Sequence, residues 1–396
     1  MGRASVIVPG FSFAGLPAGI KKSGAYDLAL IFSEKPAALA GVFTTNRIKA
    51  APVRLAIKQI SSQRGQAVIV NSGNANACTG TAGYKNAGEM TGLTAKTLGI
   101  PSALVYVAST GVIGRPLPME KIRRAVPLLV KRLSPFDLDK AASAIMTTDT
   151  FAKIFTKKIR IGRKTGVIAG IAKGAGMICP DMATMLCFMF TDIAVTPEAL
   201  DSALREAVRN SFNRISIDND MSTNDTAMAM ANGLLQNTPV AKGSPAYRTF
   251  ANALRDVAYE LAKMIVTDGE GATKLVEITV KGSRTGTDAE RVARAVANSM
   301  LVKTAIYGRD PNWGRIIAAI GYSGTEVRED RIDIYLNNVR LVRKGTGTKK
   351  EPEARELLAE KNISLTIDLG MGTKSAKALT CDLTEKYIKI NAHYTT

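Results

Sequence analysis

The residue with the clearest chemical potential is Thr184, near the middle of a chain of 396 residues. It follows Ala183 within residues 173–186 (KGAGMICPDMATML), a run that contains glycines before the threonine and apolar residues after it. A chain that cuts itself before a threonine exposes a free amine beside the hydroxyl, and this pair forms a nucleophile with its own base. The chain contains one histidine, His393, so the usual serine and cysteine triads and most zinc sites are disfavoured.

The chemistry at Thr184 can be written step by step. Attack of the Thr184 hydroxyl on the Ala183 carbonyl forms an ester by an N-to-O acyl shift, and water then releases the Thr184 amine. This α-amine has a reference pKa of about 7.7 to 8.0, so it can accept the hydroxyl proton near neutral pH. The alternative is that residues 182–190 form a buried strand in which Thr184 is a hydrogen-bonded core hydroxyl. Composition alone favours that simpler interpretation.

Acyl transfer also needs donors that face the developing oxyanion. Residues 109–114 (STGVIG) follow a short β-rich run at 103–108, which places the Thr110 hydroxyl and the Gly111 backbone N–H at the end of an expected strand. The turn could direct both donors at one atom. Small turns after strands are common, so this segment is weak evidence by itself.

Composition and charge limit the class of protein. The chain is 46% hydrophobic and 22% charged, and its length suggests two or three domains or one large layered assembly. Its net charge is +19, from 53 basic and 34 acidic residues. Because the basic residues are dispersed and lack interleaved aromatics, we interpret them as solvated faces and expect no nucleic-acid partner.

The sequence gives no sign of a membrane or metal protein. No stretch approaches the roughly 20 uninterrupted apolar residues of a membrane span, and residues 1–6 lack the pattern of a signal peptide. We therefore expect a cytoplasmic protein without a membrane partner. The four cysteines lack the paired spacing of a zinc site, so we expect buried free thiols and no metal; they are Cys78, Cys179, Cys187 and Cys381.

Strand and helix signals alternate along the chain. Residues 66–71 and 103–108 are predicted strands. Ser244 and Pro245 form a start signal for a helix that should end near residues 268–269, and further helices are expected after Thr196 and around Asp288. This alternation predicts mixed α/β layers.

Several long motifs carry a resemblance to a known family. They resemble the ornithine acetyltransferase family, also called glutamate N-acetyltransferase, and occur in order over nearly the whole chain. The motifs are residues 109–114, 146–150 (MTTDT), 173–186, 268–274 (DGEGATK), 308–315 (GRDPNWGR) and 391–396 (NAHYTT).

The resemblance implies an enzyme of arginine biosynthesis that cleaves itself between Ala183 and Thr184. Such an enzyme moves an acetyl group from N-acetylornithine to glutamate by a ping-pong mechanism through acetyl-threonine. Some relatives also accept acetyl-CoA, and the sequence does not decide whether this chain does; no other cofactor is implied. Residues 1–183 would supply the oxyanion hole and substrate loops, and residues 184–396 would begin with the nucleophile. Two copies of each fragment would form a tetramer.

The resemblance also implies a fold and a set of site residues. The fold is a layered α/β sandwich related to self-processing aminopeptidases, with a smaller C-terminal α/β region from about residue 240. Thr110 and Gly111 match the oxyanion-hole pair. The substrate-contacting positions match Thr147, Lys173, Thr184, Glu270, Asn391 and Thr396.

Simple electrostatics is compatible with these roles, because Lys173 could meet a substrate carboxylate and Glu270 an ammonium group. Spacing does not separate Thr147 from Thr148, and we choose Thr147 from the match. Without the resemblance, the charged residues would be interpreted as solvated and the C-terminus as a frayed tail. Two further function classes stay open: a self-processing aminopeptidase, and a binding protein without catalytic activity.

Overall fold

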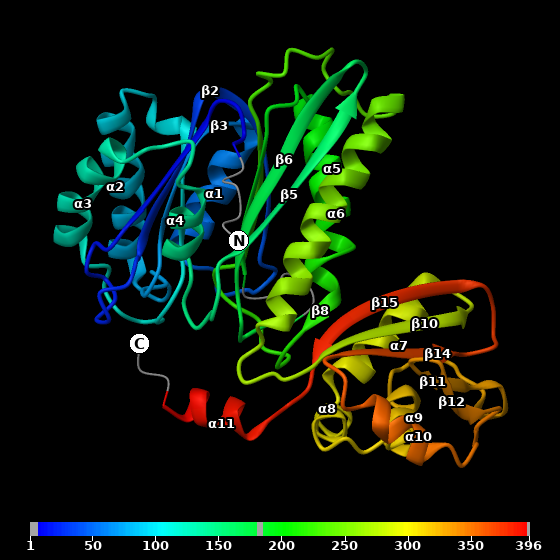
Figure 1. Cartoon of the computed structure of the whole chain (residues 1–396). Coiled ribbons are helices and arrows are strands. Elements are labelled where there is room, and N and C mark those ends of the chain that lie inside the picture. Colours follow the sequence, from blue (N-terminus) through cyan, green and yellow to red (C-terminus); the bar gives the residue numbers. More distant parts are fainter. Residues whose placement is uncertain (1–6, 180–184, 394–396) are drawn as a thin grey trace.

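The computed structural model describes residues 7–179 and 185–393. In these residues helices and strands alternate along the chain, and the strands form two β-sheets with helices packed against both (Figure 1). The mixed α/β class expected from the sequence is confirmed.

The first sheet has the strand order β4-β3-β2-β9-β7-β6-β5, and β1 pairs with β2 off this path. Its strands are β1 (Phe11–Leu16), β2 (Leu28–Phe43), β3 (Arg64–Asn71), β4 (Val105–Ser109), β5 (Lys153–Ile161), β6 (Lys164–Lys173), β7 (Leu186–Thr191) and β9 (Thr226–Ala231).

The long strand β2 divides this sheet into two layers. Its first part pairs with β1 and β3, its register with β3 shifts between Phe32 and Ala37, and its last part pairs with β9. Buried apolar side chains from both parts of the sheet form one core cluster, in which the ring centroids of Phe13 and Phe190 are 5.1 Å apart. The two parts of the sheet therefore face each other across a shared core.

Helices cover the outer faces of the two layers because successive side chains of a strand point to opposite faces. Ile31 of β2 faces the central core, whereas Leu30 packs with the helices outside it. Figure 1 shows α1 (Ala51–Gln59), α2 (Gly80–Leu98) and α3 (Met119–Lys131) beside β2 and β3, and α5 (Pro197–Arg209) and α6 (Pro245–Thr267) beside β5 and β6. The short helix α4 (Leu138–Ala144) packs against β1. The layered α/β sandwich is confirmed.

The second sheet has the order β13-β12-β11-β14-β10-β15-β8. Its strands are β8 (Ile215–Ser216), β10 (Leu275–Ser283), β11 (Asp333–Leu336), β12 (Val339–Arg343), β13 (Thr346–Gly347), β14 (Asn362–Asp368) and β15 (Lys374–Cys381). The accompanying helices are α7 (Gly286–Asn298), α8 (Met300–Tyr307), α9 (Trp313–Gly321) and α10 (Glu351–Leu357). After β15, α11 (Glu385–Ala392) extends back beneath the first sheet in the view of Figure 1.

The sheets do not divide at the expected position of about residue 240. Helix α6 packs against β5 and β6 of the first sheet, and the main strands of the second sheet start at Leu275. Strands β7 and β9, which follow residue 183, lie between β2 and β6, which precede it. The division into fragments 1–183 and 184–396 stays a prediction, and both fragments would contribute to one sheet.

Candidate active site

The predicted site residues that the structure describes meet at one cavity of about 320 Å³. They come from distant parts of the chain and include the hydroxyl and glycine of the expected oxyanion hole. The residues are Thr110, Gly111, Thr147, Lys173, Glu270 and Asn391. Ala183, Thr184 and Thr396 lie outside the described residues.

The turn that carries Thr110 and Gly111 is fixed by backbone contacts at the end of β4. The Thr110 N–H donates to the Asn71 carbonyl oxygen at 3.0 Å. Gly111 has a φ of +131°, and a Cβ at this position would overlap the backbone of Gly73 and Asn74. Only glycine fits this turn. Within residues 7–179 and 185–393, the Gly111 N–H has no hydrogen-bond acceptor, so it is available to a ligand in the cavity.

Lys173 orients the Thr110 hydroxyl. It lies at the end of β6, is 3% exposed, and its Nζ donates to Thr110 Oγ1 at 3.1 Å. Burial lowers the pKa of Lys173, and the Asp149 carboxylate opposes this change. Because the ammonium group occupies a lone pair of Oγ1, the hydroxyl hydrogen of Thr110 is free to donate elsewhere. The sequence suggested a substrate carboxylate as the partner of Lys173, and the structure shows the contact with Thr110.

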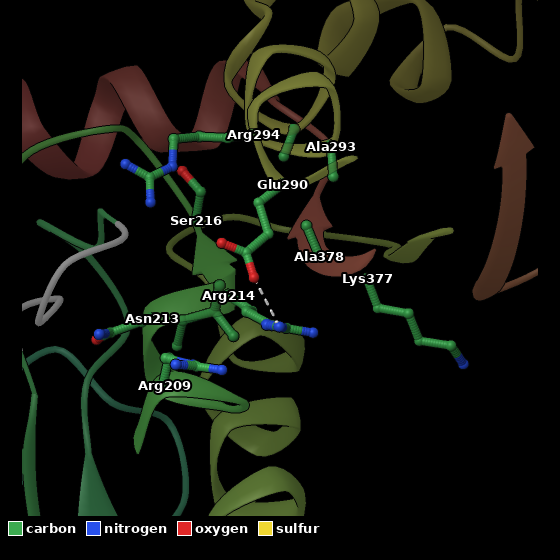
Figure 2. Close-up of a pocket in the computed structure, with 11 residues that line it drawn as sticks. Arg209, Asn213, Arg214, Ser216, Glu290, Ala293, Arg294, Lys377 and Ala378 are labelled. Carbon is green, nitrogen blue, oxygen red and sulfur yellow. Dashed lines mark hydrogen bonds and ion pairs between the residues drawn. The ribbon is translucent and has the colours of Figure 1, made fainter. Parts of the chain in front are cut away.

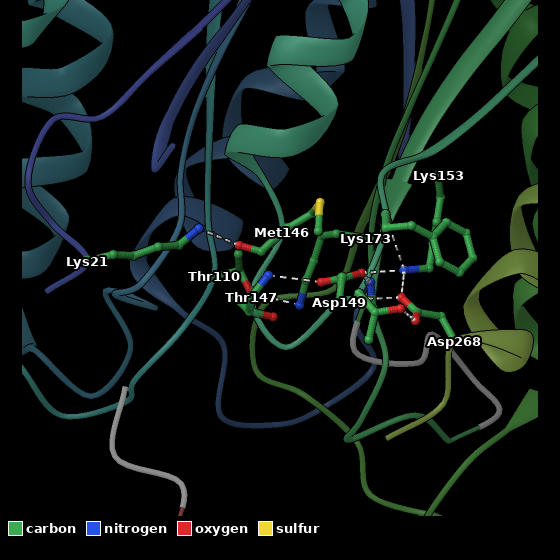
Figure 3. A network of polar contacts seen from close by, with 11 residues as sticks. Lys21, Thr110, Met146, Thr147, Asp149, Lys153, Lys173 and Asp268 are labelled. Atoms are coloured by element: carbon green, nitrogen blue, oxygen red, sulfur yellow. Dashed lines mark hydrogen bonds and ion pairs between the residues drawn. The ribbon is translucent and has the colours of Figure 1, made fainter. Parts of the chain in front are cut away.

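A buried ionic cluster holds the loops around the cavity (Figure 3). Lys153 of β5 is fully buried, and its Nζ lies 2.6 Å from both Asp149 Oδ1 and Asp268 Oδ2. The Asp149 carboxylate also accepts hydrogen bonds from the backbone of Thr147 at 2.9 Å and Gly174 at 2.7 Å. Burial opposes ionisation of Asp149, but the nearby lysine ammonium groups hold its pKa below the usual value.

The same cluster extends to the acidic side of the cavity. Asp268 accepts hydrogen bonds from the backbone N–H and the hydroxyl of Thr150. Two residues later, the Glu270 N–H donates to the Ala175 carbonyl oxygen at 2.7 Å, and Glu270 Oε2 accepts from Asn391 Nδ2 at 2.8 Å. Three segments far apart in sequence are therefore fixed relative to one another.

No sequence motif indicated the supporting roles of the ionic cluster. Asp149 and Asp268 stand inside two of the family-like motifs, but Lys153 lies in a strand between motifs. The only signal for Lys153 was a lysine in a partly apolar strand. Its two partners are 4 and 115 positions away, so its role depends on the folded chain.

Other cavity residues were also missed, among them Val112, Ile113, Gly176, Met177 and Ser222. Thr148 lines the cavity together with Thr147, so the choice between them stays a prediction. Asn224 lines it too, and its Nδ2 donates to the carbonyl oxygens of Ala75 and Ser109 at 2.7 and 2.8 Å. Asn224 therefore supports the turn that carries Thr110.

Asp225 contacts the residue that directly follows Thr184. Its Oδ1 accepts a hydrogen bond from the Met185 N–H at 3.0 Å. Its Oδ2 is buried and has no hydrogen-bond partner within the described part of the chain. Burial raises the pKa of Asp225 well above its usual value. A titratable group that no sequence motif singled out thus contacts the backbone of Met185, the residue that follows the expected nucleophile in sequence.

Three further findings concern the described residues alone. They contain no cluster of histidine, cysteine, aspartate and glutamate side chains able to hold a metal ion. They include no helix with the length and apolar character needed to cross a membrane. The four cysteines are free thiols, but the expectation that all are buried is wrong, because Cys78 is exposed. Cys78 precedes the first turn of α2 with a φ of +56°, on the surface of the molecule.

Comparison with known proteins gives the family. Residues 12–396 match the ArgJ family. The arginine biosynthesis bifunctional protein ArgJ of Geobacter sulfurreducens is 53% identical over 391 residues, which cover 98% of this chain and 100% of the relative. The chain belongs to the ArgJ family. The resemblance stated from the motifs is confirmed, as are the expectations of an acetyltransferase and of a role in arginine biosynthesis.

Solved structures include relatives of this ArgJ-family chain. An arginine biosynthesis bifunctional protein ArgJ from Bacillus halodurans is 42% identical with a TM-score of 0.51, and the match covers 52% of this chain and 98% of that chain. An ornithine acetyltransferase from Mycobacterium tuberculosis, solved with ornithine, is 39% identical with a TM-score of 0.39 and covers 44% of this chain and 92% of that chain. The substrates of this chain are small molecules.

Proposed function

We propose that the chain transfers an acetyl group from N-acetylornithine to glutamate through an acetyl-Thr184 intermediate. The observation that carries this proposal is the convergence of six predicted residues at one cavity, although they come from five separate motifs. The oriented hydroxyl of Thr110 and the free N–H of Gly111 support acyl transfer in particular, since they are the donors that a tetrahedral intermediate requires.

The proposed reaction begins with cleavage of the Ala183–Thr184 bond. The released Thr184 amine accepts the proton of the neighbouring hydroxyl as the oxygen attacks the acetyl carbonyl of N-acetylornithine. Thr110 and Gly111 donate hydrogen bonds to the oxyanion, and the ornithine amine leaves with the proton. The glutamate amine then attacks the acetyl-threonine ester, and Thr184 recovers its hydroxyl proton as N-acetylglutamate leaves.

Glu270 is the residue we assign to the ammonium group of the bound amino acid. Its carboxylate lines the cavity and is held by Asn391. Lys173, which is buried beneath Thr110, adds positive charge near the position of the oxyanion. Opposite charges on two sides of the cavity suit substrates that carry both a carboxylate and an amine.

Cleavage into two fragments is supported by the Bacillus halodurans relative. The match spans 98% of that chain but only 52% of this one, so that chain is about half as long. We further propose that two copies of each fragment assemble into a tetramer, and that acetyl-CoA can replace N-acetylornithine as acetyl donor.

The test compares Thr184→Ala with Thr184→Ser in the full chain. We predict that Thr184→Ala abolishes cleavage and acetyl transfer, whereas Thr184→Ser retains part of both because a serine hydroxyl can replace the nucleophile. Intact-mass analysis measures cleavage, and the production of N-acetylglutamate measures transfer. An active Thr184→Ala enzyme contradicts the proposal.

Product analysis separates the proposal from its alternatives. An aminopeptidase-like hydrolase would release acetate from N-acetylornithine without glutamate, whereas the proposed transferase needs glutamate for turnover. A wild-type chain that stays uncut at 42.1 kDa and gains no acetyl group on Thr184 would favour a binding protein. Parallel assays with N-acetylornithine and acetyl-CoA decide which donors are used.

A further inference from the structure

A second cavity, of about 240 Å³, lies outside the candidate active site. It is formed where α5, β8, β15 and α7 meet (Figure 2). Among the described residues, Arg209, Arg214 and Arg294 line it together with one acidic residue, Glu290. The nature of these side chains indicates an anionic ligand.

The contacts of the charged residues leave an excess of positive charge. Arg214 Nη2 pairs with Glu290 at 2.8 Å. Arg209, at the end of α5, has no ion pair or side-chain hydrogen bond within the described part of the chain, and it is exposed. Lys377 also borders the cavity, but its ammonium group binds Glu277 at 2.6 Å, and Figure 2 shows its side chain directed away from Arg214. Among the described residues that line the cavity, the one carboxylate is paired with Arg214, and the guanidinium group of Arg209 adds a positive charge that this carboxylate does not neutralise.

Arg214 carries an unsatisfied donor. Its Nε is buried and has no hydrogen-bond partner in the described structure, although its Nη2 is paired. A buried donor without an acceptor loses its hydrogen bonds to water and gains none in the protein. An arginine side chain presents its N–H groups in a planar fork that fits the oxygens of a phosphate or carboxylate. The unpaired Nε therefore marks a position for an acceptor oxygen.

The remaining walls leave space for a ligand. Ser216, Ala293, Ala297 and Ala378 are small residues, and α7 presents its alanines to the cavity at intervals of one helical turn. A water molecule accounts for about 30 Å³ of liquid volume, so the cavity can hold a phosphate with part of the molecule attached to it. A doubly charged phosphate suits several arginines better than a singly charged carboxylate does.

We propose that this cavity binds the phosphate group of a small molecule, with Arg209 and Arg214 as its main ligands. The cavity is close to the candidate active site, because β8 connects them. Ser216 lines the second cavity, and two residues later Asp218 accepts a hydrogen bond from the N–H of Met177, which lines the first. Two residues of backbone span at most about 7 Å. The phosphate belongs either to a coenzyme A thioester donor or to a free phosphate compound.

Direct binding tests the phosphate site. Isothermal titration of the full chain with inorganic phosphate and with adenosine 3′,5′-bisphosphate, at constant ionic strength, should show binding that weakens roughly tenfold in Arg209→Gln and in Arg214→Lys. Arg209→Gln removes the charge of an exposed side chain that has no ion pair within the described residues. Arg214→Lys keeps a positive charge near Glu290 but loses the planar set of guanidinium N–H donors. Arg291→Gln, an exposed change on α7 outside the cavity, is the charge-matched control.

The control variant should bind both probes as the wild type does. Absence of wild-type binding to both probes at 10 mM, about a hundredfold above a weak 0.1 mM site, would overturn the proposal. Equal weakening in Arg291→Gln and Arg209→Gln would overturn it too, because the loss would then reflect net charge alone.

Kinetics identifies the source of the phosphate, and this part depends on the proposed acetyl transfer. A roughly tenfold higher KM for acetyl-CoA in Arg209→Gln, with an unchanged KM for N-acetylornithine, assigns the cavity to the thioester donor. Unchanged KM values for both donors, together with weaker phosphate binding, assign it to a free phosphate compound. A higher KM for N-acetylornithine would contradict a separate site. A wild-type protein that transfers no acetyl group from either donor would reject the proposed function, but it would leave the phosphate-binding result intact.

Discussion

At the scale of single residues, the chemistry depends on the direction of the Thr110 hydroxyl. Lys173 donates to its oxygen, while the backbone of Asn71 and the conformation of Gly111 fix the turn. Motif spacing identified Thr110, Gly111 and Lys173 as site residues. It could not reveal that Lys173 contacts Thr110, because the two residues are 63 positions apart in sequence. They come together only when the chain folds and β4 and β6 join the same sheet.

Two substitutions separate the contribution of the Thr110 hydroxyl from that of the Thr110 methyl group. We predict that Thr110→Ala slows acetylation of Thr184 by about 10²-fold or more, because one oxyanion donor is lost, and that Thr110→Ser recovers most of the rate. Single-turnover release of ornithine measures this step. Unchanged turnover in Thr110→Ala would assign the residue to the turn alone.

The lowered pKa of Lys173 predicts a pH dependence. Raising the pH deprotonates the Thr184 amine, which increases the rate near its reference pKa of about 7.7 to 8.0. Raising the pH also removes the proton from Lys173, at a pH below the usual 10.5, because burial disfavours its charge. A neutral amine can accept the Thr110 hydrogen, which turns this donor away from the oxyanion.

We therefore expect a bell-shaped pH profile for ornithine release in a single turnover, with an alkaline decline below pH 10.5. Lys173→Met should lower the rate and lose the alkaline decline, whereas Thr110→Ser should keep it. A wild-type rate that is constant up to pH 10.5 would contradict this role of Lys173.

At the scale of helices and strands, local sequence signals predicted where an element begins better than they predicted which strands pair with each other. The helix expected from Ser244 is α6, where the Ser244 side chain accepts a hydrogen bond from the Tyr247 N–H, and it ends before Asp268 as expected. The strand expected at residues 103–108 begins at Val105, because residues 102–104 form a 3₁₀ turn. Caps and apolar periodicity act within a few residues, so they carry this information. Strand order depends on pairings between distant segments, which leave no local pattern.

Strand β5 offers a matched pair of lysines for a stability test. Lys153 is buried between Asp149 and Asp268. Lys157 lies four residues further along the same strand and pairs with Asp256 near the surface. We predict that Lys153→Met destabilises the fold by about 3–5 kcal/mol, because two buried carboxylates lose their counter-charge. Lys157→Met should cost about 0–1 kcal/mol.

Denaturant unfolding of both variants in the uncleaved Thr184→Ala background measures these differences on a single chain. Similar decreases in the free energy of unfolding for Lys153→Met and Lys157→Met would show that the buried cluster contributes no more stability than a surface ion pair. The same variants, made without Thr184→Ala, show whether the cluster is also needed for acetyl transfer.

At the scale of the whole molecule, the two predicted fragments share the first sheet. Strand β7 pairs with β6 on one side and β9 on the other, and β9 also pairs with β2. The sequence predicted the layers and the position of the cut, but not this interleaving. The eight hydrogen-bonded strands described for this sheet would thus come from two polypeptides, with residues 1–183 on both sides of strands from residues 184–396.

We predict that the fragments stay together after cleavage, because separating them would expose the buried central core and break two rows of strand pairing. Native mass spectrometry should detect both fragments in one complex, and denaturing conditions should separate them. Spontaneous dissociation in native buffer would contradict the strand order of the sheet.

The position of β7 in the middle of the sheet has a consequence for recovery from heat. In the intact chain, β6 and β7 are joined by residues 174–185, so after melting they search for each other at a high effective concentration. A severed chain loses this tether, and reassembly becomes an encounter between two molecules that slows on dilution. After the proposed cut, recovery from heat would therefore depend on protein concentration, whereas recovery of the uncut chain would not.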